Sequence, residues 1–498
     1  MARPLRLLMV SSEVESFART GGLGDVVLGV SRALGQRGVD VAIVTPLYGT
    51  TKIPSDDLHR WIGTVPARVG WGPDDVRECG VVEVRLGPGV RVFLVDDPGL
   101  FQRDGIYGDA QGTFGDNELR FATMSRAALS IAERLWGGVG PDRGPDVIHA
   151  HDWHATFAIL YARLTMGQAW SDVPSVFTIH NLAYQGVLGF DSLDRLALPR
   201  EGYHPGILEH RGLVNLLKGA IALSDRTTTV SPTYAHEILV PEGGFQLHDF
   251  LRTQSYKTAG ILNGIDVQTF DPRTDSTIAA QYGVEDFAPA RFRNKEALFH
   301  ELGLHEPRAP LFSLVSRLTH QKGIDLILPI LGNLVQGGAR VALVGKGDPD
   351  LERALYQLGG RFPGRIATRV AFDEGLARRI YAGSDFLMVP SRYEPCGLTQ
   401  MYAMRYGCVP IVTDVGGLHD TVAPYNPVRD EGTGFVARNR DPLSLLIAAD
   451  DAFTAYHDHR SFHRLIERGM RKDFSWTRSA NEYLERIYRP ITQLRTGL

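Results

Sequence analysis

The sequence is poor in cysteine and carries no large excess of charge of either sign. Its 498 residues include three cysteines, Cys79, Cys396 and Cys408, an odd number without the spacing of a metal site. We therefore expect neither a disulfide framework nor a zinc site, and a reducing compartment. The formal net charge of -4 argues against nucleic acid as a partner, because a polyanion binder normally carries a basic excess.

Long apolar runs are also missing. No run has the length of a membrane span, and residues 1–6 lead straight into a strand pattern without room for a signal or transit peptide. We expect a cytoplasmic protein with no membrane partner. A Gly-x-Gly-x-x-Gly fingerprint after the first strand is absent too, which argues against a nicotinamide oxidoreductase.

Strand-like and helix-like segments alternate along the chain, which predicts an α/β protein with parallel sheets. The strand candidates of the first half are 5–10, 39–45, 90–95, 146–150, 175–179 and 226–230. Those of the second half are 259–262, 311–316, 340–344, 365–370, 385–389 and 409–412. We therefore predict two doubly wound domains, 1–257 and 258–474. Residues 475–498 read as a helix that packs back on the first domain or simply ends the second.

One pentad, Gly-Gly-Leu-x-Asp, occurs twice, at 21–25 and at 416–420. Each copy follows a short apolar run and opens a helix-like segment. A glycine pair lets the backbone approach a ligand closely, and a helix N-terminus favours an anion. A single copy would fit an ordinary tight turn equally well. Two copies in two halves suggest an anion-handling loop in each domain.

Charged residues follow two strands of the second half. Arg317 and Lys322 come after 311–316, and two cations on such a loop suit a diphosphate, although a solvated surface loop fits the spacing equally. Glu394 and the segment 396–399 come after 385–389. A carboxylate beside a helix N-terminus suits a sugar attached to phosphate, and an ordinary helix start fits as well.

Histidines follow two strands of the first half. His151, Asp152 and His154 come after 146–150, and His180 and Asn181 come after 175–179. Polar and aromatic residues at the ends of successive strands suit carbohydrate. Zinc binding by the first two histidines is conceivable, but the spacing suggests no further ligand.

These motifs, taken in order, resemble one family, the bacterial glycogen synthases and plant starch synthases that use a nucleotide-diphosphate glucose. The resemblance covers nearly the whole chain. Its motifs lie at 20–26, 116–117 with 120–121, 151–154, 178–181, 262–266, 316–318 with 321–323, 390–398 and 416–420. The absence of a long N-terminal extension favours the bacterial branch.

The resemblance implies two Rossmann-like domains facing across a deep cleft (the GT-B arrangement). It also implies retaining transfer of glucose from ADP-glucose to the non-reducing end of an α-1,4-glucan such as glycogen, with no cofactor or metal. The groups that would hold the ADP phosphates are Gly21, Gly22, Arg317, Lys322 and the backbone of Gly397, Leu398 and Thr399. Cys396 and Arg19 would also belong to the substrate-binding residues. The groups that would hold the donor glucose are His180, Asn263 and Glu394. Asp152 and Asn181 would lie between donor and acceptor, and Phe372 would stack on adenine.

The sequence departs from the family pattern at Arg19, where the family usually has lysine before Thr-Gly-Gly. The charge is kept, but a guanidinium is larger and hydrogen-bonds differently. The loop 243–247 also matches only loosely. UDP-glucose as donor, a small acceptor, a sugar-nucleotide isomerase and a binding-only relative remain alternatives, the last disfavoured because Arg317, Lys322 and Glu394 are all present.

Overall fold

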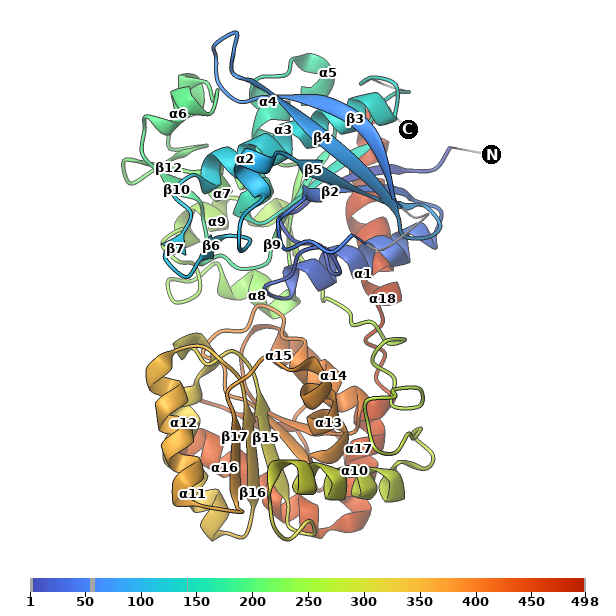
Figure 1. The fold of residues 1–498 in the computed structure, drawn as a ribbon, viewed down its shortest axis with the longest axis vertical. Coiled ribbons are helices and arrows are strands. Elements are labelled where there is room, and N and C mark those ends of the chain that lie inside the picture. The colour runs from blue at the N-terminus through green and yellow to red at the C-terminus, as the bar shows by residue number, and fades with distance from the viewer. Residues whose placement is uncertain (1–2, 54–58, 141, 497–498) are drawn as a thin grey trace. The chain divides into compact units, whose positions relative to one another are not determined.

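A computed structural model describes residues 3–53, 59–140 and 142–496, and the chain divides into two compact units (Figure 1). The first unit comprises 1–230, 235–264 and 476–498, and the second comprises 231–234 and 265–475. This division differs from the predicted boundary after residue 257. The strand expected to open the second domain is β14 (Thr258–Gly260), and it pairs in parallel with β13 (Arg226–Thr229) of the first unit.

Within the described residues, the main sheet of the first unit has nine strands in the order β14-β13-β9-β8-β1-β2-β5-β4-β3. The bounds are β1 (Arg6–Val10), β2 (Asp40–Pro46), β3 (His59–Arg68), β4 (Val76–Arg85), β5 (Val90–Asp96), β8 (Val147–His151) and β9 (Ser175–Ile179). All neighbours are parallel except at β4, which runs antiparallel to β3 and β5. The strand order reverses between β1 and β8, so a ligand is expected beyond their carboxyl ends.

The hairpin β3–β4 is missing from the predicted strands. Its two strands contain Arg60, Glu78, Glu83 and Arg85, so they form no apolar run. Strand β3 is largely exposed, whereas β4 is buried from Cys79 to Val84 but is interrupted by Glu83. The prediction relied on continuous apolar segments and therefore missed both strands.

Helix α1 (Leu23–Gly35) and the C-terminal segment share one core in the first unit. That segment consists of α18 (Trp476–Glu482), a π-helical turn (Tyr483–Tyr488) and α19 (Arg489–Thr496). A Cβ atom on Gly29 would lie 2.1 Å from the indole nitrogen of Trp476, so the glycine allows the two helices to approach closely. The end of the chain therefore packs on the N-terminal unit.

The remaining helices of the first unit connect its strands. The longest are α3 (Asn117–Leu135), α4 (Thr156–Leu164) and α7 (Leu216–Leu223), and α4 packs against both of the others. Shorter elements are α2 (Pro98–Phe101), β6 (Gly108–Asp109), β7 (Gly112–Thr113), α5 (Gln168–Ser171), β10 (Val187–Leu188), α6 (Ser192–Arg195), β11 (Glu209–His210), β12 (Leu213–Asn215) and α9 (His248–Thr253). Helix α8 (Pro232–Glu237) begins in the segment 231–234 of the second unit and ends in the first.

The sheet of the second unit is parallel, with the order β17-β16-β15-β18-β19-β20 in the described residues. Its strands are β15 (Leu311–Val315), β16 (Arg340–Val344), β17 (Ile366–Arg369), β18 (Phe386–Val389), β19 (Val409–Thr413) and β20 (Phe435–Ala437). Numbered along the chain, the order is 3-2-1-4-5-6, that of a dinucleotide-binding Rossmann sheet. The order reverses between β15 and β18, where the two charged loops begin.

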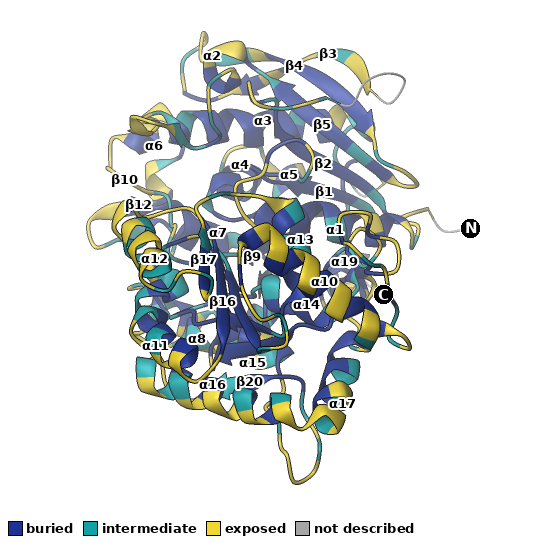
Figure 2. Ribbon diagram, turned by 60° about the horizontal axis from the view of Figure 1, so that its bottom comes forward, coloured by how far each residue is buried: buried dark blue, intermediate teal, exposed yellow. Residues whose placement is uncertain are grey.

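Helices of the second unit connect these strands. They are α10 (Phe287–Leu302), α11 (Ile324–Gln336), α12 (Pro349–Arg361), α13 (Glu374–Gly383), α14 (Thr399–Arg405), α15 (Gly416–Thr421), α16 (Pro442–His457) and α17 (His459–Met470). Strands β15 and β16 are almost fully buried, whereas α12 buries only Leu355 (Figure 2). The prediction of two Rossmann-like domains is confirmed.

Candidate active site

The two charged loops of the second unit meet through a buried ion pair. Lys322 Nζ donates to Glu394 Oε2 at 2.6 Å, and Ser391 Oγ donates to the same oxygen at 2.7 Å. Glu394 is 6% exposed. Lys322 ends the loop after β15 and Glu394 belongs to the loop after β18, so the reversal point of the sheet brings them together.

Further contacts fix the same two loops. Arg392 forms a bidentate ion pair with Asp325, at 2.7 and 2.6 Å. Gly323 has φ 65°, and a Cβ atom there would lie 1.9 Å from the carbonyl oxygen of Pro390. Arg317, by contrast, is exposed at the end of β15. The loops are therefore rigidly joined around the ion pair, with one cation open to solvent.

The second copy of the pentad packs directly on the Glu394 loop. Gly417 N donates to the carbonyl of Glu394 at 3.0 Å, and a Cβ atom on Gly417 would lie 1.9 Å from the carbonyl oxygen of Cys396. Gly397 has φ 71°, and Leu398 is the N-cap of α14, which starts at Thr399. The glycine pair of this copy thus shapes the turn that carries the glutamate.

The first copy of the pentad is organised by a carboxylate that the sequence analysis missed. Glu13 is 3% exposed, and its carboxylate accepts hydrogen bonds from Thr20 N (2.7 Å), Thr20 Oγ1 (2.7 Å), Gly21 N (3.2 Å) and Tyr107 OH (2.6 Å). No local sequence signal distinguishes this glutamate, because its partners come from two other loops. Arg19, where the sequence departs from the family pattern, directly precedes this glycine loop and pairs with Asp25 at 3.1 Å.

His180 is half-buried and lies in a cluster of histidines in the first unit whose other members are buried. Its Nε2 hydrogen-bonds with His151 Nδ1 at 3.0 Å; His180 directly follows β9, and His151 is the last residue of the neighbouring strand β8. Burial lowers the pKa of His180 to about 3, so this imidazole is neutral. Burial also lowers the pKa of His151, which the nearby histidines lower further. The cluster therefore supplies hydrogen-bonding groups without positive charge.

Asp152 fixes the backbone of the loop that contains His180. Its Oδ1 accepts from His180 N at 2.7 Å and from Asn181 N at 3.3 Å. Its φ of 56° is in the left-handed region that is unusual for a residue with a side chain, and such strain concentrates at functional sites. Burial raises the pKa of Asp152 to about 7, although the two backbone donors oppose the shift.

The C-terminal segment reaches this cluster through a chain of hydrogen bonds. Tyr488 OH hydrogen-bonds with His149 Nδ1 at 2.7 Å, and His149 Nε2 with Thr178 Oγ1 at 2.6 Å. The ring of His149 lies 4.1 Å from that of His151. The last helices of the chain therefore support the strand ends from which His151 and His180 project.

The other predicted site residues are more scattered. Asn263 is buried in the first unit, just after β14, rather than in the second domain where the predicted boundary had placed it. Phe372 is 71% exposed on the loop after β17. Asn181 Oδ1 accepts from Ala183 N at 3.1 Å and shapes its own turn.

Two other kinds of feature are absent from the described residues. Residues 3–53, 59–140 and 142–496 hold no cluster of three or more histidine, cysteine, aspartate or glutamate side chains arranged as metal ligands. None of the helices in these same ranges combines the length and the apolar character that crossing a membrane requires.

Comparison with known proteins places this geometry in a family. Residues 6–253 match the family described as starch synthase catalytic domain, and residues 309–454 match glycosyl transferases group 1. The glycogen synthase of Koribacter versatilis is 39% identical over 99% of this chain and 100% of its own length. That of Anaeromyxobacter dehalogenans strain 2CP-1 is 42% identical over 98% of this chain and 99% of its own.

Comparison with solved structures leads to the same family. The catalytic domain of starch synthase IV from Arabidopsis thaliana, bound to ADP and acarbose, has a TM-score of 0.89 and 33% identity, covering 99% of this chain and 100% of its own. Sucrose-phosphate synthase from Thermosynechococcus elongatus, at 17% identity and a TM-score of 0.61, shares the fold.

Two Rossmann-like units, with charged and polar loops at the carboxyl ends of their strands, define the chain as a retaining glycosyltransferase of the GT-B class. The near-complete coverage of the relatives then fixes the family. The chain belongs to the glycogen synthase and starch synthase family, as the motifs predicted.

Proposed function

We propose that this chain transfers glucose from ADP-glucose to the non-reducing end of an α-1,4-glucan, with retention at the anomeric carbon. The Lys322–Glu394 pair at the reversal point of the second sheet is the observation that carries the assignment, because it joins a phosphate-binding cation to a sugar-binding carboxylate. The ADP and acarbose bound to the related starch synthase IV support a nucleotide diphosphate and a glucan-like partner.

The donor phosphates are assigned to cations and backbone N–H groups. As the bond from glucose to phosphate breaks, negative charge develops on the leaving diphosphate, and Arg317 and Lys322 stabilise it. The N–H groups from Gly397 to Thr399 add hydrogen bonds at the start of α14. In the first unit, Arg19 and the Gly21-Gly22 loop are assigned to the same phosphates.

The sugar and the base are assigned to polar and aromatic groups. His180, Asn263 and Glu394 hold the hydroxyls of the donor glucose, and Phe372 offers an exposed ring to adenine. Neutral His180 suits hydroxyl recognition, since it can donate and accept. Asp152 acts mainly through the backbone of His180 and Asn181, which places those two residues for donor and acceptor.

Retention follows from attack on the face that the phosphate leaves, with the phosphate accepting the acceptor proton. The alternative is a covalent intermediate on an enzyme carboxylate, as in retaining glycosidases. The environment of Glu394 supports the first route. Its Oε2 accepts from Lys322 and Ser391, and donors to a carboxylate stabilise its charge and weaken it as a nucleophile.

The reaction is proposed to need no metal, because Arg317 and Lys322 supply the charge that a divalent ion would otherwise provide. Activity should survive treatment with a chelator such as EDTA. A loss of activity that Mg²⁺ or Mn²⁺ restores would contradict this part of the proposal.

A cytoplasmic location is proposed from the cysteines. Cys79 and Cys408 are free and buried, and free thiols persist in a reducing compartment. Fractionation of the producing cell should recover the protein with cytoplasmic markers, and recovery with an extracytoplasmic fraction would contradict it.

A donor panel tests the function as a whole. ADP-glucose and UDP-glucose are each incubated with glycogen or with free glucose, and both nucleotide release and glucan growth are measured. We expect growth only with ADP-glucose and glycogen. Faster turnover with UDP-glucose or with free glucose would favour another retaining transferase, and donor conversion without any acceptor would favour an isomerase.

A further inference from the structure

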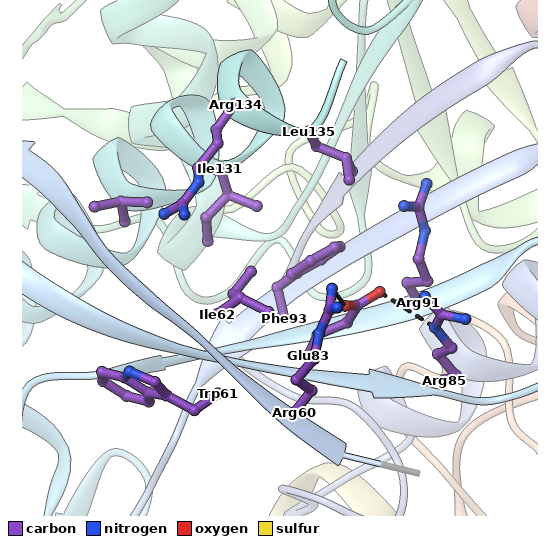
Figure 3. Close-up of a pocket in the computed structure, with 11 residues that line it drawn as sticks. Arg60, Trp61, Ile62, Glu83, Arg85, Arg91, Phe93, Ile131, Arg134 and Leu135 are labelled. Atoms are coloured by element: carbon purple, nitrogen blue, oxygen red, sulfur yellow. Dashed lines mark hydrogen bonds and ion pairs between the residues drawn. The ribbon is translucent and has the colours of Figure 1, made fainter. Parts of the chain in front are cut away.

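Two buried glutamates of the first unit have partners of different kinds. Glu83 is 4% exposed and lines a pocket of about 500 Å³ between β3, β4, β5 and the end of α3 (Figure 3). It pairs with Arg60 at 2.9 Å and with Arg85 at 3.5 Å, so its charge is neutralised by neighbouring cations. Glu13 is 3% exposed, but its carboxylate accepts from uncharged N–H and O–H groups. These donors come from two separate loops, which the carboxylate therefore connects.

The first glycine loop, residues 19–22, has little packing of its own. All four residues are exposed, and a Cβ atom on Gly21 would meet nothing within 4 Å. The conformation of the loop therefore depends on polar contacts, of which the ion pair between Arg19 and Asp25 is one. The others are made by Glu13, whose Oε2 accepts from the backbone N–H groups of Thr20 and Gly21 and whose Oε1 accepts from the Thr20 hydroxyl.

Tyr107 anchors the same carboxylate from a third segment of the chain. Its hydroxyl donates to Glu13 Oε1 at 2.6 Å, and its ring stacks on that of His154, with centroids 4.6 Å apart. The backbone carbonyl of Tyr107 accepts from Asn117 Nδ2 at 2.9 Å, and Asn117 Oδ1 accepts from buried Arg120 at 2.6 Å. Asn117 and Arg120 belong to the family motif at the start of α3, and these contacts give that motif a task, the fixing of Tyr107.

We propose that Glu13 is a positioning residue for the donor, and that the motif at the start of α3 acts on the first glycine loop through Tyr107 and this carboxylate. The proposal rests on the assignment of the loop to the donor phosphates. Because Glu13 takes the N–H groups of Thr20 and Gly21, those left for an anion begin at Gly22, the N-cap of α1. A loop that is already ordered binds its ligand without the entropic cost of ordering it.

The two oxygens of Glu13 separate positioning from a requirement for charge. Oε2 accepts from backbone N–H groups, which can only donate, whereas Oε1 accepts from two hydroxyls, which can also accept. A glutamine can therefore keep its carbonyl oxygen on the backbone groups and turn its NH2 group towards the hydroxyls. Glu13→Gln should keep most of the order of the loop, whereas Glu13→Ala should lose it.

The experiment combines initial rates with ADP-glucose and glycogen with amide hydrogen exchange of the full chain without ligand. We expect Glu13→Ala to raise the KM for ADP-glucose about tenfold and to accelerate exchange in residues 19–22, and Glu13→Gln to raise the KM about threefold at most. Glu83→Gln is the matched control, because it neutralises a glutamate buried to a similar degree in the same unit. It should lower the melting temperature but change neither the KM nor the exchange of the loop.

Tyr107→Phe tests the connection to α3. It should raise the KM for ADP-glucose about threefold in the parent and have no further effect on it in Glu13→Ala, because both changes remove the same hydrogen bond. An unchanged KM in Tyr107→Phe would by itself overturn the proposal, even if Glu13→Ala did not fold.

The two measurements also separate this proposal from the proposed function. Equal losses in Glu13→Gln and Glu13→Ala, or a raised KM with unchanged exchange, would overturn positioning in favour of a direct action of the charge on the donor. Unchanged KM and unchanged exchange in Glu13→Ala would overturn it outright. Faster exchange with an unchanged KM would support the ordering of the loop by Glu13 but remove the loop from the donor site, which is a failure of the functional assignment.

Discussion

Lys322 and Glu394 act as a unit at the scale of single residues. Each is largely buried, with side chains 19% and 8% exposed, and each is the other's ion-pair partner. Removing one side chain leaves the other as a buried charge without its partner. The resulting loss of folding free energy is far larger than the net stabilisation that the intact pair provides. Stability and activity at these two positions are therefore coupled.

We predict that Lys322→Ala and Glu394→Ala each lower turnover at least about a hundredfold, a loss typical of removing a transition-state charge partner. Because the two side chains share one interaction, the double variant should be less impaired than the product of the single losses. Turnover with ADP-glucose and glycogen is the measurement. Lys52→Ala and Glu285→Gln, both exposed, serve as controls. Near-normal glucan synthesis by either single variant would refute the assignment.

Arg19 tests the residue at which the sequence departs from its family. Its pairing with Asp25 orients the guanidinium beside the first glycine loop. We predict that Arg19→Lys stays within a few fold of the parent, whereas Arg19→Ala raises the KM for ADP-glucose about tenfold, the effect of one lost charge-assisted contact. Unchanged turnover and unchanged donor affinity in Arg19→Ala would exclude a donor contact.

At the scale of elements, the two copies of the pentad differ although their sequences match. The second copy is packed tightly against the turn of Glu394, with Gly416 at φ 40° and Gly417 touching backbone. The first copy is open at Gly21, where a Cβ atom would meet nothing within 4 Å. Gly417 of the second copy is therefore required by packing, whereas Gly21 of the first copy is not.

Gly417→Ala should damage the fold of the site. Its Cβ atom would overlap the carbonyl of Cys396, a backbone atom that cannot move aside without shifting Glu394. We predict a lower melting temperature and at least about a tenfold loss of turnover. Gly360→Ala, inside α12 with open space around it, is the matched control and should be neutral or slightly stabilising. Equal behaviour of the two variants would contradict this interpretation.

Gly21→Ala, unlike Gly417→Ala, should weaken donor binding without lowering stability. The methyl group fits the protein, so the melting temperature should not change, but it would obstruct a phosphate approaching the backbone. We predict about a tenfold rise in the KM for ADP-glucose, measured by initial rates. An unchanged KM would remove the first glycine loop from the donor site.

At the scale of the whole molecule, buried histidines make stability depend on pH. Burial lowers the pKa values of His149, His154 and His180 to about 3, and lowers that of His151 as well. Below about pH 6.5 the unfolded chain binds protons at these positions and the native chain does not. Each histidine therefore removes about 1.4 kcal/mol of stability per pH unit of acidification, until its native pKa is reached.

Asp152 opposes this trend. Its pKa is raised by burial to about 7, so between the ordinary aspartate value and pH 7 the native chain holds one extra proton. The histidines outnumber it, and we predict that the urea midpoint falls steadily from about pH 7 to pH 5. In His154→Phe the fall should be smaller, whereas in His59→Gln, an exposed control on β3, it should match the parent. A midpoint independent of pH would contradict the burial of these imidazoles.

The features that could be predicted from the sequence are those that depend on residues close together in the chain. Buried parallel strands are short apolar runs, and motifs with Arg317, Glu394 and His180 follow their ends. The fold class and the family could therefore be inferred, whereas the roles of the site residues stay a prediction. The β3–β4 hairpin was missed because its charged face breaks the apolar run. The predicted domain boundary differs because the local pattern identifies β14 as a strand but does not say which sheet it joins. Its pairing with β13 places it in the first unit.

By itself, then, the sequence determined two Rossmann-like domains and a glycosyltransferase of the glycogen synthase family. The tertiary structure alone decided that Lys322 meets Glu394, that Glu13 organises the first glycine loop, and that Arg60, Arg85, Arg91 and Arg134 share a pocket. The physical reason is that a strand or a glycine turn depends on local periodicity and backbone freedom. Contacts between distant residues depend on strand order and register, which only the packed chain fixes.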